Sequence, residues 1–266
     1  MKQPDSNLPA RQPLRLFSLA LALLLPVLLV AVARGAPDLD PAVHLPFIAR
    51  PEETLAEVRG LWVTRFDWTN YGQPAQSSRI DEMVADASRA GFNMILFQVR
   101  GVADAYYQPG PEPWAQRVSG TTLGTPPDPY WDPLAYFIQK AHQEGIELHA
   151  YINVYPVWDN CSQAPPHTSP EHFYWTLIAE HGKTDVQPNG LQWDDNYNVS
   201  CSTYLRATPA SVFGDNQYLA VAAHLASNYD IDGLHLDHIR YAGRYTSCDP
   251  VSLARGGPCS QSTAYQ

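Results

Sequence analysis

The feature of this sequence that most limits its fold is a regular alternation, from Val58 onward, of short apolar runs with amphipathic segments. This alternation is typical of βαβ units, in which parallel strands are joined by helices that cover the sheet. We expect four strands, over residues 59–65, 93–100, 147–155 and 231–239. The segments between them predict helices over residues 78–90, 132–145 and 216–229.

Local signals mark where two of these helices begin. Ser78 and Asp81 have the spacing of a capping box, in which two side chains satisfy free N–H groups of the first turn. Asp132 followed by Pro133 combines a cap residue with a proline at the first helical position. These signals support helices at both places.

Side-chain alternation along the strands separates an apolar face from a polar one, because successive strand residues point to opposite sides. A doubly wound sheet is covered on both faces and is apolar on both. A barrel has one face under helices and the other lining an interior whose C-terminal mouth holds the active site. We therefore expect an α/β fold, a (β/α)8 TIM barrel. The residues of the third and fourth strands on its inner face are His149, Tyr151, Asn153, Gly233, His235 and Asp237.

The sequence of the first strand does not decide which of its residues face the barrel interior. Either Thr64 or the pair Arg65 and Asp67 faces the interior, because the apolar pattern of this strand fits both arrangements.

The number of βα units falls short of a closed barrel. A complete barrel needs eight units and about 250 residues, whereas only four units are used by Tyr241. Residues 242–266 are rich in Gly, Ser and Pro and predict no further strand. Either the chain is an incomplete gene product, which we favour, or it is a half-barrel that must pair to hide an open edge. We expect it to be inactive alone and to associate through the fourth strand.

The N-terminus predicts export. Basic residues precede an apolar run over residues 16–33, which ends in the small-x-small sequence of a signal peptidase site. The run also approaches the length of a membrane span, so an uncleaved anchor is the alternative. We expect a signal peptide or anchor over residues 1–33, a linker over 34–56 and a partial TIM-barrel domain over 57–266, in a protein that is secreted or attached to the membrane.

The net charge limits the partners that the chain can bind, and the cysteines limit its cross-links and metal sites. The formal net charge of −10 argues against nucleic acid. An exported protein can form disulfides, and of the three possible connectivities we favour Cys161 with Cys201 and Cys248 with Cys259. A zinc site is disfavoured because no C-x-x-C spacing occurs, and we expect no cofactor. The connection over residues 156–214 is too long for an ordinary loop and is expected to be functional.

Asp237 is the leading candidate for a catalytic carboxylate. It follows an inward-facing strand at the end where barrel enzymes place catalytic groups. There it could act as nucleophile or base on a glycosidic carbon, while a second carboxylic acid protonates the leaving oxygen. The alternative is an aspartate that caps the strand end and pairs with Arg240. A metal site is disfavoured, because alternation sends His238 to the opposite face.

Polar and aromatic residues near the expected mouth suit a hydroxyl-rich ligand, which needs amides, charged donors and aromatic platforms. His235 could hold Asp237 ionised or be a satisfied core histidine, and Arg100 could instead only neutralise Asp104. The candidate substrate-binding residues are Gln98, Arg100, Asp104, Tyr107, His149, Tyr151, Asn153, Tyr155, Trp158, His235 and Arg240.

Four segments carry a family resemblance: RGLWVT (59–64), FQVRGVADAYY (97–107), WDPLAYFIQKAHQEGIELHAYINVY (131–155) and DGLHLDHIRY (232–241). In the right order and over roughly residues 57–245, they resemble glycosyl hydrolase-like family 10. The resemblance implies a TIM-barrel fold, bacterial export and hydrolysis of glycosidic bonds in cell-wall glycan, and it covers the N-terminal half of the family's domain. DGLHLD is also similar to the fourth-strand motif of α-amylase-like enzymes, whose final Asp is the nucleophile, although those enzymes carry Arg in place of His235.

The functional expectation is therefore hydrolysis of O-glycosidic bonds in an extracytoplasmic glycan by a pair of carboxylates. Two alternatives stay open. One is a carbohydrate-binding protein without catalysis, and the other is a metal-dependent polysaccharide deacetylase, which requires a set of His and Asp ligands.

Overall fold

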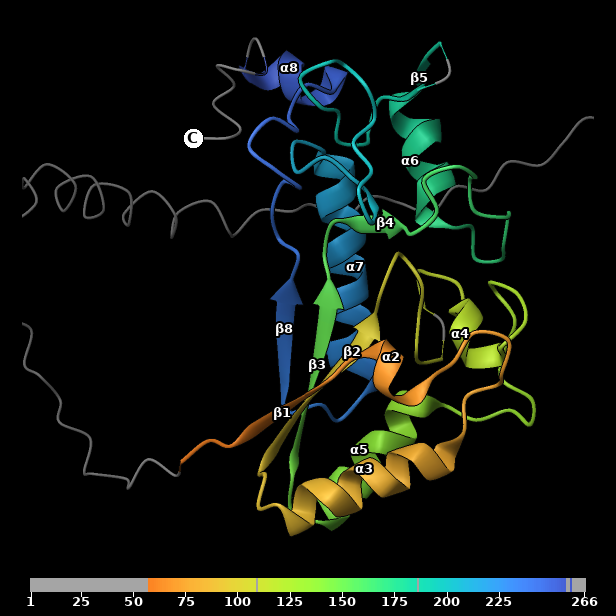
Figure 1. Ribbon diagram of the computed structural model, residues 1–266, viewed down its shortest axis with the longest axis vertical. Helices are drawn as coiled ribbons and strands as arrows, with labels where there is room; N and C mark the ends of the chain where they lie inside the picture. The colour runs from red at the N-terminus through yellow and green to blue at the C-terminus, as the bar shows by residue number, and fades with distance from the viewer. Residues whose placement is uncertain (1–56, 109, 186, 257–258, 260–266) are drawn as a thin grey trace, which may run out of the picture. The chain divides into compact units, whose positions relative to one another are not determined.

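A computed structural model describes residues 57–266 except 109, 186, 257–258 and 260–266. Its centre is a four-stranded parallel sheet in the order β1-β2-β3-β8, as an α/β fold requires (Figure 1). The expected strands are all present, each shorter than expected by one to four residues. The strands are β1 (Gly60–Val63), β2 (Met94–Arg100), β3 (Glu147–Asn153) and β8 (Gly233–Asp237).

The main hydrophobic core lies between one face of this sheet and three helices: α3 (Ser77–Arg89), α5 (Pro133–Gln143) and α7 (Val212–Asn228). Phe97 of β2 packs edge-on against Phe137 of α5, with ring centroids 4.7 Å apart. The apolar face predicted from the alternation along the strands therefore packs under helices. Fully buried residues on this face of the sheet include Ile95, Phe97, Leu148, Ala150 and Ile152.

Helix starts follow local chemistry, with two corrections. Asp132 caps α5 as predicted, because its carboxylate accepts from the N–H groups of Leu134 and Ala135. The predicted Ser78 capping box is wrong: α3 begins earlier, after Gln76, whose side chain makes no cap hydrogen bond. The third helix also begins four residues earlier than expected.

The start of α7 is fixed by Ser211, a residue not considered as a cap. Its hydroxyl accepts from the N–H of Gly214 and lies 2.7 Å from Nε2 of His181. A serine cap satisfies a free N–H group of the first turn, which is why the helix begins here rather than at Asn216.

The first strand ends sooner than expected because the short helix α2 (Arg65–Trp68) begins directly after it. Thr64 is the N-cap of α2, and its hydroxyl accepts from the N–H of Phe66. Asp67 closes a capping box by accepting from the N–H of Thr64 at 2.6 Å. Neither expected set faces the interior as a whole, because Thr64 and Asp67 build the cap of α2 while Arg65 is buried.

The long connection after β3 folds into its own substructure beyond the arrowheads of β3 and β8 (Figure 1). Strand β4 (Pro156–Trp158) pairs antiparallel with β7 (Leu205–Arg206), and helix α6 (Phe173–His181) precedes the two-residue strands β5 (Lys183–Thr184) and β6 (Gln187–Pro188). The disulfide between Cys161 and Cys201 closes this connection, which is the pairing we expected.

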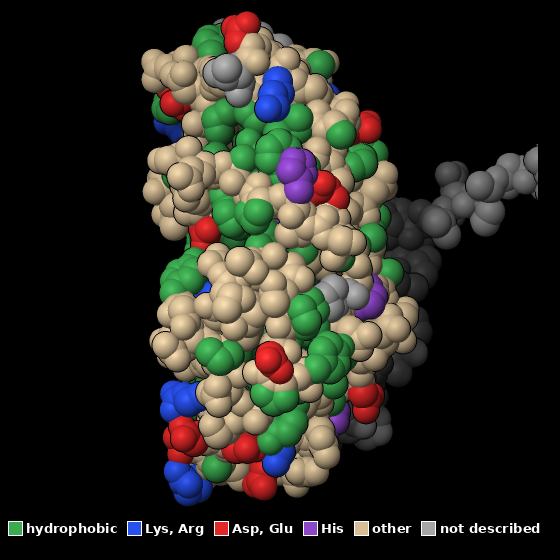
Figure 2. Space-filling view, turned by 90° about the vertical axis from the view of Figure 1, so that its right-hand side faces the viewer, with side chains coloured by type: hydrophobic (Ala, Val, Ile, Leu, Met, Phe, Trp, Pro, Cys, Tyr) green, Lys and Arg blue, Asp and Glu red, His purple; other side chains and the backbone are tan. Residues whose placement is uncertain are grey.

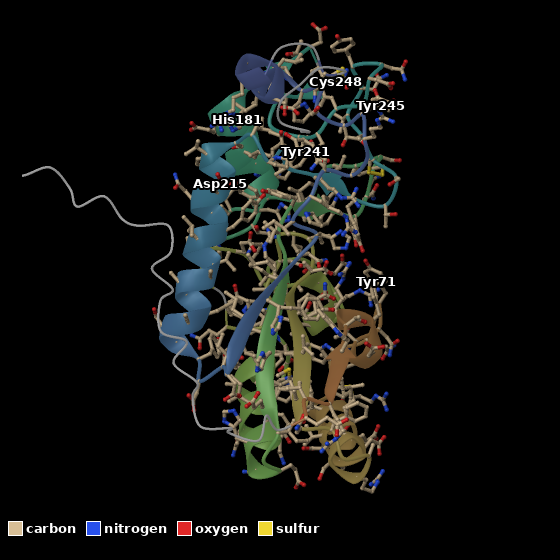
Figure 3. The ribbon with its side chains drawn as sticks, turned by 90° about the vertical axis from the view of Figure 1, so that its left-hand side faces the viewer. Tyr71, His181, Asp215, Tyr241, Tyr245 and Cys248 are labelled. Atoms are coloured by element: carbon tan, nitrogen blue, oxygen red, sulfur yellow. A yellow bond between two sulfur atoms is a disulfide. The ribbon has the colours of Figure 1, made fainter. Side chains whose placement is uncertain are left out.

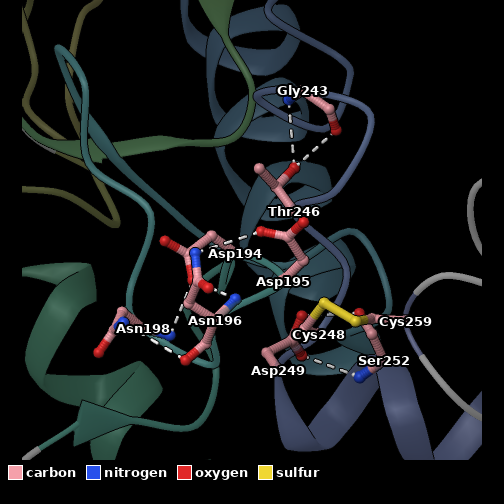
Figure 4. Close-up of a disulfide and its surroundings, with 10 residues drawn as sticks. All are labelled: Asp194, Asp195, Asn196, Asn198, Gly243, Thr246, Cys248, Asp249, Ser252 and Cys259. Carbon is pink, nitrogen blue, oxygen red and sulfur yellow. Dashed lines mark hydrogen bonds between the residues drawn. A yellow bond between two sulfur atoms is a disulfide. The ribbon is translucent and has the colours of Figure 1, made fainter.

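After β8 the chain forms helix α8 (Pro250–Gly256). A short helix, α4 (Gln116–Ser119), lies in the loop between β2 and α5. Buried Asp249 accepts from the N–H and the hydroxyl of Ser252, and the expected disulfide joins Cys248 to Cys259 beside it (Figure 4). Within the described residues no strand follows β8, so β1 and β8 are the edges of the sheet.

The expected signal or anchor over residues 1–33 and the linker over 34–56 lie outside the described residues. Within those that are described, no helix is both long and apolar enough to cross a membrane. Figure 2 shows one face of the molecule, on which acidic and basic side chains are interspersed and hydrophobic side chains form small patches.

Candidate functional site

Asp237 lies at the C-terminal end of β8, where Asn153 of β3 is its register partner. Its carboxylate accepts from the N–H of His238 at 2.6 Å. No ion pair among the described residues includes Asp237, so the alternative pairing with exposed Arg240 is not made. The carboxylate is half-buried and available to a ligand.

The inner face of the sheet brings the predicted residues of β3 and β8 together. Nδ1 of His149 lies 2.8 Å from Nε2 of His235, and Trp62 of β1 packs edge-on against Tyr151 with ring centroids 4.7 Å apart. Gly233 makes room for this arrangement, because a Cβ atom there would overlap the His149 imidazole. The predicted alternation of β3 and β8 is therefore confirmed.

Asn153, at the C-terminal end of β3, holds the loop after β2. Its Nδ2 donates to the carbonyl of Gly101 at 3.1 Å, while its Oδ1 is buried without a hydrogen-bond partner among the described residues. Its side chain is 2% exposed, which makes it a support for the loop more than a surface contact.

His238 corrects the prediction made from alternation. Its backbone adopts a left-handed φ of 51°, so the strand pattern stops at Asp237. The His238 ring lies 5.8 Å from the ring of Tyr204, in the same region as Asp237. Burial lowers the pKa of His238, nearby Asp237 raises it, and Arg240, Arg206 and Arg65 lower it. The neutral imidazole is therefore favoured beside the carboxylate.

Two residues of this region, Tyr204 and Arg206, come from a segment that gave no signal in the sequence, and both contact one another or Arg65. Nη2 of Arg65 donates to the hydroxyl of Tyr204 at 3.0 Å, and Nη1 of Arg206 donates to the carbonyl of Tyr204 at 3.2 Å. Tyr204 and Arg206 come from the long connection, whose irregular path cannot be read from periodicity. We call the following set the mouth cluster: Arg65, Tyr151, Tyr204, Arg206, Asp237 and His238.

Charges in the mouth cluster act on one another. The pKa of Tyr151 is raised by burial and by Asp237, whose negative charge disfavours a phenolate. Asp104 lies next to Arg65, and burial raises the pKa of Asp104 although its carboxylate accepts from the N–H groups of Gly101 and Val102. Tyr151 therefore remains a neutral hydrogen-bonding group at working pH.

The expectation that Arg100 binds substrate at the mouth is wrong. The β2–β3 register shifts between Gln98 and Arg100, so Gln98 pairs with Tyr151 but Arg100 pairs with Ile152, a residue of the helix-covered face. Such a bulge re-aims a side chain to the other side of the sheet. Arg100 is fully buried there and donates from Nε and Nη2 to Glu112, at 2.6 and 2.8 Å.

Tyr107 and Tyr155 also turn away from the mouth. Tyr107 is fully buried and stacks on His224 of α7, with ring centroids 5.6 Å apart. Tyr155 lies beyond the end of β3, and its ring is 5.5 Å from that of Tyr218. Both aromatic rings therefore contribute to packing under α7, whose upper end carries Asp215 in Figure 3.

Gln98 and Trp158 lie near the mouth cluster but are engaged within the fold. Gln98 is 3% exposed and accepts from the N–H of Arg65 at 3.1 Å. Trp158 donates from Nε1 to the carbonyl of Gln163 and lines a cavity of about 20 Å³ with Arg65 and Asp104. That cavity holds about one water molecule, too little for a sugar ring.

A metal site has no support from the described part of the chain, in which no three His, Cys, Asp or Glu side chains are grouped closely enough to hold an ion. His149 and His235 contact each other and Glu147 lies 3.2 Å from His149, which makes them a hydrogen-bonded chain.

A model of the family described as Glycosyl hydrolase-like 10 matches residues 57–254. The chain belongs to this family. The resemblance seen in the four sequence segments is thereby confirmed. Asp237 lies inside the matched residues of this Glycosyl hydrolase-like 10 domain, at the end of β8.

Two curated relatives carry glycosyl hydrolase names. Glycosyl hydrolase YngK of Bacillus subtilis (strain 168) is 24% identical over 209 residues, which are 75% of this chain and 36% of YngK. Glycosyl hydrolase DigH of Escherichia coli (strain K12) is 24% identical over 266 residues, 89% of this chain and 53% of DigH. The chain thus spans 36% and 53% of the lengths of these relatives.

Solved structures are less similar. The GH36 α-galactosidase AgaA of Geobacillus stearothermophilus shares 12% identity at a TM-score of 0.43, over 78% of this chain and 24% of that one. Likeness at this level is loose and adds nothing to the family assignment.

Proposed function

We propose that this chain belongs to an enzyme that hydrolyses O-glycosidic bonds in an extracytoplasmic glycan, a bacterial cell-wall polysaccharide, with Asp237 as one of two carboxylates. The observation that carries the proposal is the position of Asp237 at the C-terminal end of a parallel strand, in a glycosyl hydrolase-like domain. Catalytic groups of barrel enzymes come from these strand ends.

The surroundings of Asp237 suit a nucleophile or base. The hydrogen bond from the N–H of His238 fixes the direction of the Asp237 carboxylate. The neutral His238 imidazole and the Tyr151 hydroxyl offer hydrogen bonds to sugar hydroxyls without a competing negative charge. A second carboxylic acid would protonate the leaving oxygen.

The domain itself is proposed to be part of a (β/α)8 barrel, with four βα units in this chain. Support comes from the two sheet edges, β1 and β8, which pair with no further strand among the described residues, and from side chains left exposed beside them. Trp62 of β1 is 54% exposed and Leu236 of β8 is 52% exposed, although both occupy strand positions. Further strands would cover both.

Export is proposed from the N-terminal segment alone, with the signal either cleaved or kept as a membrane anchor. A glycan outside the cytoplasm is then the expected partner. The charge of −10 makes nucleic acid an unfavourable one.

The test is to incubate the intact natural protein with purified cell-wall glycan and to measure new reducing ends, released acetate and binding to the glycan. New reducing ends in proportion to time support glycoside hydrolysis. Released acetate without new reducing ends would instead identify a deacetylase. Binding to the glycan with neither product would identify a carbohydrate-binding protein, and both of these outcomes would overturn the proposal.

A further inference from the structure

Ser211 and His181 form a hydroxyl–imidazole pair outside the mouth cluster. Oγ of Ser211 lies 2.7 Å from Nε2 of His181, within hydrogen-bond distance. The same hydroxyl accepts from the N–H of Gly214 at 3.0 Å, so its own hydrogen is free to be donated to the imidazole. A serine hydroxyl within reach of an imidazole base is the first requirement for an activated nucleophile.

The pair lines a cavity of about 410 Å³, a volume that can hold a small organic ligand. Ser211 is otherwise buried, at 1% exposure, so a substrate would meet its hydroxyl from this cavity. In Figure 3 His181 lies beside the upper end of α7, and no residue of the mouth cluster lines the cavity. The wall suits a short apolar group, since it includes Ala210, Phe213, Pro250 and Val251.

The imidazole of His181 is held in place by its neighbours. Nδ2 of Asn189 donates to the carbonyl of His181 at 2.9 Å. Gly190 lies so close that a Cβ atom there would be 2.7 Å from Cδ2 of the ring, and Phe213 packs edge-on with ring centroids 6.4 Å apart. The base is therefore positioned before a substrate enters, which an efficient reaction requires.

The protonation state of His181 suits a general base. Burial lowers the pKa of His181, while the neighbouring Glu180 raises it to a smaller extent. The neutral imidazole is therefore favoured at neutral pH and can take a proton. Glu180 lines the same cavity, and its negative charge stabilises the imidazolium that forms.

Backbone N–H groups next to Ser211 can stabilise an oxyanion. Ser211 is the N-cap of α7, so the N–H groups of Val212 and Phe213 have no acceptor within the helix. Both residues line the cavity. Free N–H groups beside a nucleophile are the donors that an acyl-transfer reaction needs when negative charge develops on the carbonyl oxygen.

We propose that Ser211 and His181 form a separate active site that hydrolyses a carboxylic ester with a short acyl chain. Oγ of Ser211 attacks the carbonyl carbon while its proton passes to Nε2 of His181, and the alcohol leaves with this proton as the ester C–O bond breaks. Water then attacks the acyl group on Ser211, and its proton passes through His181 back to the serine oxygen. One ester and one water thus become one acid and one alcohol. This inference does not depend on glycoside hydrolysis at Asp237.

The experiment treats the full chain with diisopropyl fluorophosphate, whose phosphorus is attacked by activated serines with loss of fluoride. Peptide mass mapping then locates the modified residue. We expect the phosphoryl group on Ser211 and none on exposed Ser88, whose hydroxyl donates to Glu144 and not to a histidine. Turnover is measured separately, as release of p-nitrophenol from p-nitrophenyl acetate.

Two variants and a control make the result specific. Ser211→Asn removes the hydroxyl but keeps a side-chain oxygen that can cap α7, so this variant should fold and lose turnover. His181→Asn should lower both the rate of phosphorylation at Ser211 and kcat/KM for the ester by at least about a hundredfold, the usual effect of losing a general base. His167→Asn, whose side chain is 69% exposed, tests for ester hydrolysis by surface imidazoles and should leave both rates unchanged. Thermal unfolding reports whether each variant is folded.

An unmodified Ser211 in wild type treated with excess diisopropyl fluorophosphate would overturn the inference. Equal rates of modification in wild type and His181→Asn would do the same, because the imidazole would then not activate the hydroxyl. Modification of Ser211 without turnover of p-nitrophenyl acetate would also overturn it. A purely structural pair, in which His181 only holds the cap of α7, predicts less stable variants but an unmodified serine in wild type.

Discussion

Nε2 of His172 lies 3.2 Å from the carbonyl oxygen of Val102, which joins the long connection to the loop after β2. The other ring nitrogen, Nδ1, accepts from the N–H of Tyr174 at 3.2 Å. One nitrogen donates and the other accepts, so the ring must be neutral with its proton on Nε2. Burial accordingly lowers the pKa of His172 to about 4.

This relationship predicts a loss of stability in acid. Because the folded-state pKa of His172 lies below its unfolded value of 6.5, its contribution is complete above pH 6.5 and declines as the pH falls toward about 4. The lowering corresponds to about 3 kcal/mol. Urea unfolding of wild type and His172→Asn between pH 7.5 and 4.5 should show a shallower decline for the variant.

Equal slopes for wild type and His172→Asn would contradict the account of His172 as a neutral buried group.

Arg100 and Glu112 form a fully buried ion pair that is expected to respond strongly to the loss of one partner. Glu112→Gln should lower the free energy of unfolding by about 3–5 kcal/mol, because the guanidinium would keep a buried charge without its carboxylate. Urea unfolding measures the change. Exposed Arg79 and Glu82 provide a matched pair, and Glu82→Gln should cost less than about 1 kcal/mol. Similar costs for both variants would refute this role of Arg100.

Gly233 tests the packing of the inner face. Gly233→Ala should lower stability by about 1–3 kcal/mol, because the new Cβ would overlap the His149 imidazole. The cost should largely disappear in the background of His149→Ala, which removes the ring. Thermal unfolding of the two single variants and the double variant gives the coupling. Additive effects would show that His149 does not occupy the space beside Gly233.

Among the described residues β8 is an edge of the sheet, and this edge predicts self-association of the chain. An unpaired edge strand offers free N–H and C=O groups to another molecule, and exposed Leu236 and Ile239 add apolar surface. Leu236→Lys should shift the chain toward the monomer in sedimentation velocity measured across a concentration series. Leu219→Lys on α7, which is 67% exposed, is the control. A wild-type chain that is monomeric throughout would contradict the prediction.

The sequence predicted those parts of the fold in which apolar and polar residues repeat at the spacing of a strand or a helix, or in which a cap residue marks a helix start. Strand alternation placed His149, Tyr151 and Asp237 on one face, and the cap signal at Asp132 placed the start of α5. Single-residue departures from the period were not predictable. The register shift beside Arg100 pairs this residue with Ile152, and the left-handed backbone at His238 ends the strand pattern at Asp237.

Two residues of the mouth cluster, Tyr204 and Arg206, were not predicted from the sequence for a similar physical reason. Tyr204 and Arg206 reach the strand ends through a long connection whose path depends on the β4–β7 pairing and the Cys161–Cys201 disulfide. These are long-range contacts, which local spacing does not record. Arg206 lies within the two-residue strand β7, and its role in this region gives no sequence signal until its burial is known.

The central claim is that Asp237 is a catalytic carboxylate, and the most direct measurement compares glycan hydrolysis by wild type and Asp237→Asn in the intact natural protein. Asparagine keeps the size and the acceptor for the His238 N–H but removes the charge. Asp230→Asn, whose side chain is 95% exposed, is the matched control. The account predicts at least about a hundredfold loss of kcat in Asp237→Asn, with unchanged thermal stability and glycan binding. Hydrolysis by Asp237→Asn near the wild-type rate would contradict it.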